Sequence, residues 1–316
     1  MQIQPTQKAA RLISVVSLLA INENKKKIMN FAETMRALGT RFEVVSPTAE
    51  ACAKIQEAIA TEHFDKFFEP VAVVDATNNK RRLLGIEPEY LFAWTRHIAY
   101  STRLKITHLE NAVADLLLHE QYLPSLVLTR SHLESSGMAA LCLDTLTDCM
   151  RDRNVEALER LIPQSLFGTS LYRLGKKDPV TQGLLLTVQG ETVTAKNLVD
   201  ALTKFANSTG GNGDSFARFY SLLCEFSHSN FGGTAEFRRV IEARPDGWVI
   251  QYSDSYDRQE ESVVMALEIL LASMKAGHAA CKMLSVVDFA VAGEEVRYQG
   301  PSETDMRWIW DAIINV

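Results

Sequence analysis

Apolar and polar residues alternate with helical periodicity along most of the chain after residue 86. Within residues 87–120, apolar side chains recur at steps of three and four positions, which predicts one long helix. Pro124 suits the first turn of a second helix, because that position needs no backbone N–H donor, and the pattern continues over residues 125–150. Small residues at 137–143 favour close packing of this second helix against a neighbour. Further helices are predicted over residues 155–162, 196–206, 214–227 and 259–284.

Turn-forming residues divide the helical part at two places. The segment 207–213 reads Asn-Ser-Thr-Gly-Gly-Asn-Gly, which predicts a linker, and Asp214 after it is a good cap for the next helix. Residues 237–253 carry strand-forming side chains on both sides of Arg-Pro-Asp-Gly. Because Pro pre-sets a turn and Gly accepts positive φ, the sequence predicts a β-hairpin there.

The pattern of residues 1–80 fits two topologies. Apolar runs at 12–21, 42–45 and 71–74 alternate with helix-like segments at 25–38 and 48–63. If the runs are strands, this region is a small α/β unit. The alternative is a helical region in which the first run is a buried helix.

These patterns predict a mainly α protein in three parts. Residues 1–80 form the region of uncertain topology, and residues 86–290 form a helical bundle that includes the hairpin. Residues 291–316 form a C-terminal extension with a short helix that carries Trp308 and Trp310. The helix over residues 259–284 is expected to be central, because its middle is almost free of charge.

Composition narrows the classes of protein. The net charge of -6 argues against a surface built broadly for nucleic acid, since phosphate binding draws on clustered Lys and Arg. The five cysteines are odd in number and contain no Cys-x-x-Cys, so neither a disulfide framework nor a zinc ribbon is expected. His119-Glu120 begins like a zinc-protease motif, but the second His is missing. We therefore expect no metal and no cofactor.

Two apolar runs deserve comparison with membrane segments. Residues 9–21 contain Arg11 and lack a small-residue cleavage pattern, and residues 263–274 are interrupted by Glu268. The first run is too short to cross a bilayer, and the second is also followed by Lys275 and Lys282. The sequence therefore predicts no membrane partner and a cytoplasmic location.

The most informative polar residues lie on the second long helix. One stripe of that helix places Arg130 and Glu134 on a line that is otherwise apolar. Burying such a pair costs free energy unless another group uses its hydrogen bonds. The pair is therefore either a structural ion pair or clamp, or part of a functional site. The stripe consists of Leu123, Val127, Arg130, Glu134, Gly137 and Leu141.

A second polar set closes the helix over residues 214–227. Tyr220, Cys224 and His228 are spaced by four residues and share one face, and Asn230 follows. His228 near a helix end is suited to proton transfer near neutral pH. A capping histidine that bonds the last helical carbonyls is the structural alternative.

These two motifs are similar to those of uncharacterised bacterial proteins related to HEPN domains. Residues 130–134 read Arg-Ser-x-x-Glu, and residues 220–228 read Tyr-x-x-Leu-x-x-x-x-His. The resemblance covers roughly residues 88–285 and implies an antiparallel bundle in which the two helices face each other. It also implies metal-independent RNA cleavage with His228 as the general acid or base, Arg130 stabilising phosphate charge and Glu134 orienting Arg130. Tyr220 and Asn230 would bind at the same site, and the chain would form a homodimer.

The chain departs from the HEPN ribonuclease pattern in two places. Those enzymes carry Arg and His on one helix with four to six residues between them, whereas Arg218 lies ten positions before His228. The match to that spacing is Arg103 with His108, where Leu follows the Arg instead of a polar residue. Ser229 also replaces the proline usual in the similar bacterial proteins.

The sequence therefore leaves two classes of function. The first is a non-catalytic binding module, with RNA or a partner protein as its ligand, in bacterial defence or toxin–antitoxin biology. The second is a metal-independent HEPN-like ribonuclease that uses Arg130 and His228. The missing Arg-to-His spacing favours the binding module.

Overall fold

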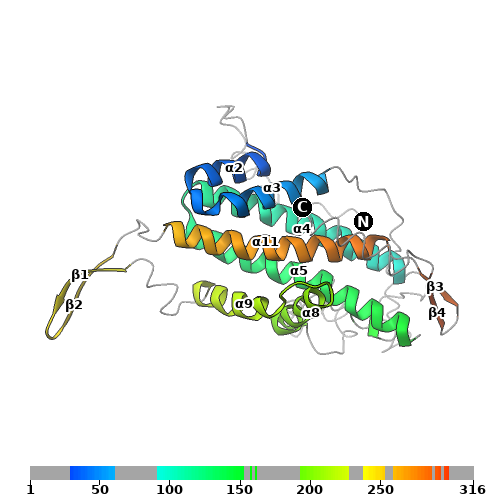
Figure 1. Ribbon diagram of the computed structural model, residues 1–316. Helices are drawn as coiled ribbons and strands as arrows, with labels where there is room; N and C mark the ends of the chain where they lie inside the picture. Colours follow the sequence, from blue (N-terminus) through cyan, green and yellow to red (C-terminus); the bar gives the residue numbers. More distant parts are fainter. Residues whose placement is uncertain are drawn as a thin grey trace, which may run out of the picture. The chain divides into compact units, whose positions relative to one another are not determined.

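A computed structural model describes most of the helical part of this chain (Figure 1). The elements below belong to one compact unit that begins at Phe31. The described residues are 29–60, 91–152, 157–158, 161, 193–227, 238–252, 259–286, 289–292 and 295–298.

Three long helices form the centre of this unit: α4 (Leu91–Leu118), α5 (Tyr122–Asp152) and α11 (Gln259–Val286). Each packs against the other two, and their facing residues, such as Leu117, Leu133 and Leu270, are fully buried. The structure therefore confirms the predicted long helices and the central place of the helix over residues 259–284. The described part of the chain is mainly α, as the sequence predicted.

Two glycines allow α5 to approach its neighbours closely. A Cβ atom added to Gly137 would lie 2.6 Å from the carbonyl oxygen of Leu198, and one added to Gly277 would lie 2.3 Å from Oγ of Ser136. These distances are far below normal van der Waals contact, so neither position has room for a larger side chain. The close packing predicted for residues 137–143 is confirmed at Gly137.

The N-terminal helices cover the outer side of this centre. Helices α2 (Phe31–Arg41) and α3 (Ser46–Ala60) pack against each other, α2 also contacts α4, and α3 contacts α11. The short link η1 (Glu43–Val45) is a 3-10 turn in which Val45 is buried.

The α/β interpretation of the N-terminal region is thus wrong for residues 42–45. Their apolar run joins two packed helices and needs only one buried side chain to do so. The other two predicted strands, at 12–21 and 71–74, lie outside the described residues.

Helices α8 (Ala195–Ser208) and α9 (Asp214–Ser227) pack against each other and against α5. Thr194 caps α8 in a reciprocal arrangement with Asn197, which satisfies backbone donors at the start of the helix. The linker is shorter than predicted, because α8 continues to Ser208. Most of the helix predicted over residues 155–162 lies outside the described residues.

Two antiparallel hairpins complete the described elements. Strands β1 (Arg238–Arg244) and β2 (Gly247–Tyr252) meet at the predicted turn, with a bulge between Val240 and Glu242, which confirms the first hairpin. Strands β3 (Phe289–Ala292) and β4 (Glu295–Tyr298) form a second hairpin that the sequence did not predict. The predicted short C-terminal helix, with Trp308 and Trp310, lies outside the described residues.

Within α11, residues Glu260–Ser285 are long and apolar enough to cross a membrane by length and composition alone. Most of this segment is buried in the helical unit. Such burial is what a core helix of a soluble protein shows, and it explains the low charge of this helix without lipid.

Candidate functional site

Three of the five predicted site residues, Arg130, Glu134 and Tyr220, lie in contact with one another. Nε of Arg130 donates to Oε1 of Glu134 at 3.0 Å, and Nη2 donates to the hydroxyl of Tyr220 at 2.8 Å. The guanidinium carbon also lies 5.0 Å from the centre of the Tyr220 ring, within range of a cation–π interaction. The cluster therefore joins α5 to α9, as the resemblance implied for these two helices.

This cluster is only partly shielded from solvent. The side chain of Arg130 is 21% exposed and that of Glu134 is 31% exposed. Burial raises the pKa of Tyr220 to about 12, and a hydrogen bond with Cys224 adds to this increase. Tyr220 is therefore a neutral phenol near pH 7. It can accept from Arg130 but cannot act there as a base.

The remaining predicted site residues cannot be placed against this cluster. His228 and Asn230 lie outside the described residues, so the predicted convergence of Arg130 with His228 stays a prediction. Cys224, one turn after Tyr220, is half-buried. The other candidate pair for RNA chemistry is separated by burial: Arg103 is 7% exposed and donates to the carbonyl of Ile59 at 2.8 Å, whereas His108 is exposed.

A second polar cluster, which was not predicted from the sequence, lies in the core between α4, α5 and α11. Oε1 of Glu110 accepts hydrogen bonds from Nε2 of His132 at 3.0 Å and from Nε2 of His278 at 2.6 Å. Nδ1 of His132 lies 2.8 Å from the hydroxyl oxygen of Ser273. Glu110, His132 and Ser273 have no exposed surface, and His278 is 2% exposed. We call these four residues the buried Glu–His cluster.

Ser273 links this cluster to the backbone of α11. Its hydroxyl oxygen lies 2.9 Å from the carbonyl oxygen of Ile269 and 2.8 Å from Nδ1 of His132. Because the carboxylate of Glu110 accepts from Nε2 of both histidines, the cluster connects α4, α5 and α11.

The histidines of this cluster determine the pKa of Glu110. Burial alone would raise the pKa of Glu110, but the positive charge of His278 and the hydrogen bonds from His132 and His278 outweigh burial and lower the pKa to about 2. Glu110 is therefore ionised at neutral pH. Because these side chains have almost no exposed surface, we interpret the cluster as a structural element.

A sequence signal for this cluster exists in the helical stripes. Glu110 falls between Ile106 and Val113 on the most buried face of α4, and His132 falls on the buried face of α5. Titratable residues on the buried faces of different helices suggest mutual pairing. The stripe of α5 through Arg130, on which the sequence-based prediction rested, is the half-exposed face of this helix.

The described residues contain no group of three or more His, Cys, Asp or Glu side chains suited to hold a metal ion. The five cysteines are free, and all except Cys224 are buried. Burial raises the pKa of Cys281 to about 12 and also raises that of Cys52, so these two thiols are poor nucleophiles.

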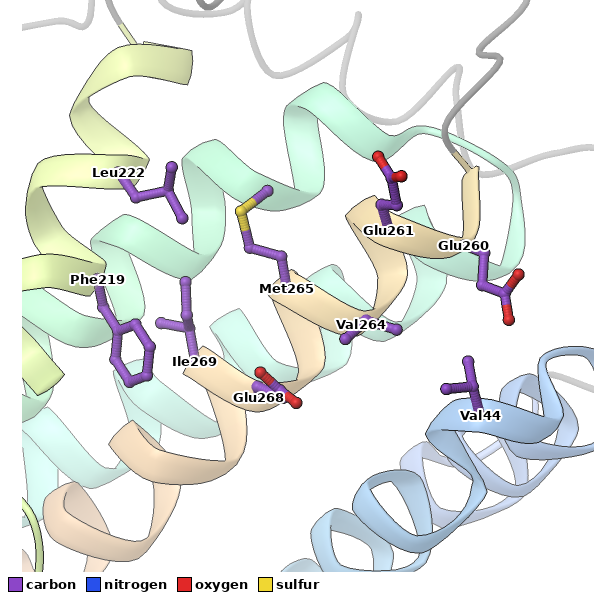
Figure 2. A pocket seen from close by; sticks show the side chains of 9 residues that line it. All are labelled: Val44, Phe219, Leu222, Glu260, Glu261, Val264, Met265, Glu268 and Ile269. Atoms are coloured by element: carbon purple, nitrogen blue, oxygen red, sulfur yellow. The ribbon is translucent and has the colours of Figure 1, made fainter.

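The structure also has a groove of about 500 Å³ between α9 and α11 (Figure 2). Phe219 and Leu222 reach into it from α9, and Met265 and Ile269 reach into it from α11. Val44, from η1, lies at the other end. The remaining lining residues are Glu260, Glu261, Val264 and Glu268. We call this feature the acidic groove.

Comparison with models of protein families, with curated proteins and with solved structures finds no match to this chain.

Proposed function

We propose that this protein is a non-catalytic helical interaction module. The observation that carries the proposal is the engagement of Arg130: two of its three nitrogen atoms donate to Glu134 and Tyr220, and its face lies near the Tyr220 ring. An arginine held in this way ties α9 to α5. The two hydrogen bonds use two of the five guanidinium N–H donors and fix the direction of the side chain within the protein.

The acidic groove is a second feature that supports an interaction module. It offers apolar side chains in a concave surface, which is a common form of binding site. Its glutamates also disfavour the negative backbone of RNA. A partner protein is therefore the better of the two predicted ligands.

The alternative is a metal-independent ribonuclease that uses Arg130 and His228. Two observations favour it: Arg130 keeps 21% of its side chain exposed, and His228 directly follows the last residue of the helix that carries Tyr220. In such an enzyme His228 would transfer the proton of the ribose 2'-hydroxyl, and Arg130 would stabilise the charge on the phosphate oxygens.

Cleavage of labelled total RNA without metal ions separates the two functions. We expect the wild-type protein to leave RNA intact, and Arg130→Ala and His228→Ala to behave like wild type. Arg218→Ala is the matched control, because Arg218 is an exposed arginine on α9. All variants should first give the helical circular dichroism spectrum of the wild type.

Cleavage by the wild type that both variants lose, and that Arg218→Ala keeps, would overturn the proposal in favour of the ribonuclease. The homodimer, the cytoplasmic location and the role in bacterial defence or toxin–antitoxin biology stay predictions.

A further inference from the structure

We propose that the acidic groove binds a basic amphipathic helix of a partner protein. This inference rests on the proposed function as an interaction module, and it names the chemistry of the partner. Four features support this inference: the packing of the helices around the groove, the spacing of the lining residues along α11, the exposure of the apolar side chains and the sign of the charge in the groove.

The groove follows from how the helices pack. Helix α9 lies on α5 and α8, while α11 lies on α4 and α5. Side chains of α9 and α11 therefore face each other across a gap that neither helix fills (Figure 2). The wall is fixed in advance, because Phe219 meets the buried Phe216 edge to face, with ring centres 6.3 Å apart.

The lining residues of α11 have the spacing of a docking surface for a helix. Glu261, Met265 and Ile269 form one row, and Glu260, Val264 and Glu268 form the next; within each row the residues are four positions apart. The two rows extend for about 14 Å at about 1.5 Å per residue. That length matches two to three turns of a bound helix.

Apolar side chains at both edges of the groove remain exposed. Leu222 is 41% exposed on α9, and Val44 is 58% exposed on η1. Ile269 at the base is 1% exposed, so it already belongs to the core. Met265, between the edges, is flexible enough to adapt to different apolar partners. The apolar face of an amphipathic helix would cover these edges.

Charge determines which kind of amphipathic helix fits. Among the residues that the structure describes, the lining includes three glutamates and no lysine or arginine. Glu260 and Glu268 are exposed at the outer row of α11, where the polar flank of a bound helix would lie. Lys or Arg on that flank would gain favourable charge interactions, and Asp or Glu would be repelled. The net charge of -6 adds long-range attraction for a basic partner.

The test uses a fluorescein-labelled peptide of about 15 residues, long enough for the estimated docking length. It carries Leu at positions one, four, five and eight of the helical repeat and Lys at the flanking positions. A matched peptide carries Glu in place of every Lys. Fluorescence anisotropy with the full-length protein gives Kd for each peptide. We expect the basic peptide to bind and the acidic peptide to bind at least about tenfold more weakly.

Two groove variants and one control locate the binding. Glu268→Lys and Leu222→Asp should each weaken binding of the basic peptide by roughly tenfold. Asp200→Lys reverses an exposed charge on α8 outside the groove, and it should change Kd by less than about twofold. All three positions are exposed, so the variants should fold, and circular dichroism checks this.

Equal binding of the two peptides, or unchanged Kd in both groove variants, would overturn the inference. So would sedimentation showing that the protein pairs with itself and that Leu222→Asp separates the pair, because the occupant would then be a second copy. If the peptide test fails and RNA stays intact, only the inference of a basic partner helix is overturned, and the proposed interaction module is not. RNA cleavage that depends on Arg130 and His228 would remove the proposed function, whatever the peptides do.

Discussion

Helix α5 contributes to two polar clusters that each contain a glutamate but differ in their exposure to solvent. Arg130 and His132 are two positions apart and so point roughly 200° apart around the helix axis. Arg130 faces α9 and keeps contact with solvent, whereas His132 faces α4 and α11 and has none. Arg130 forms an ion pair with Glu134, and His132 is hydrogen-bonded to Glu110.

From this comparison we expect the exposure of a pair to determine its effect on stability more than its chemistry does. Solvent screens the Arg130–Glu134 pair, so its loss can be compensated by water. Water cannot compensate for a residue lost from the buried Glu–His cluster, because removal of one member leaves an unpaired charge in the core. The following predictions test this difference, beginning with the largest expected effect.

Glu110→Gln should cost about 3–5 kcal/mol of the free energy of unfolding, because it removes the buried carboxylate that accepts hydrogen bonds from His132 and His278. Urea unfolding followed by circular dichroism at pH 7 measures this cost. Glu268→Gln is the control, since Glu268 is exposed on α11, and it should stay within about 0.5 kcal/mol of wild type. A cost below about 1 kcal/mol for Glu110→Gln would contradict an ionised, hydrogen-bonded Glu110 in the core.

The buried Glu–His cluster should also make stability depend on acid. Because the pKa of Glu110 is lowered from 4.5 to about 2 in the folded protein, the stabilisation it gives is present above pH 4.5 and is lost as pH falls towards 2. The difference in urea midpoint between wild type and Glu110→Gln should therefore narrow over that range. A constant difference from pH 5 to pH 2 would show that Glu110 is not ionised in the core.

Arg130→Ala should cost only about 1–2 kcal/mol, from the partly exposed ion pair and the contact with Tyr220. A double-mutant cycle with Tyr220→Phe isolates the hydrogen bond between Nη2 and the hydroxyl. We expect a coupling of about 0.5–1 kcal/mol in urea unfolding. A coupling near zero would mean that Arg130 does not tie α9 to α5, and it would weaken the case against catalysis.

Much of the fold could be predicted from periodicity. The long helices were readable because apolar residues recur at helical steps over many turns. The hairpin at residues 238–252 was readable because Arg-Pro-Asp-Gly is a strong turn signal. Short segments were less informative: four apolar residues at 42–45 suit a strand or a turn equally, and only the packing of α2 on α3 decides between them.

Part of the site could also be predicted, because some of its contacts join residues that are close in the sequence. Arg130 and Glu134 are four residues apart on one helix, so their pairing is local. The contact with Tyr220 was implied by the resemblance. The buried Glu–His cluster joins residues 22 and 168 positions apart, and the acidic groove depends on a gap between α9 and α11. Both are properties of the tertiary arrangement, which spacing along the chain does not contain.

The hairpin of β1 and β2 carries features that oppose pairing with a further strand. In the described part of the chain each strand pairs only with the other, so each has an open edge, and Val240, Ile241 and Trp248 are more than half exposed. Open apolar edges can seed polymers. The bulge after Val240 bends β1, and the Glu242–Arg244 ion pair places charge on it. An edge that is bent and charged is a poor template for another strand, even where its side chains are apolar.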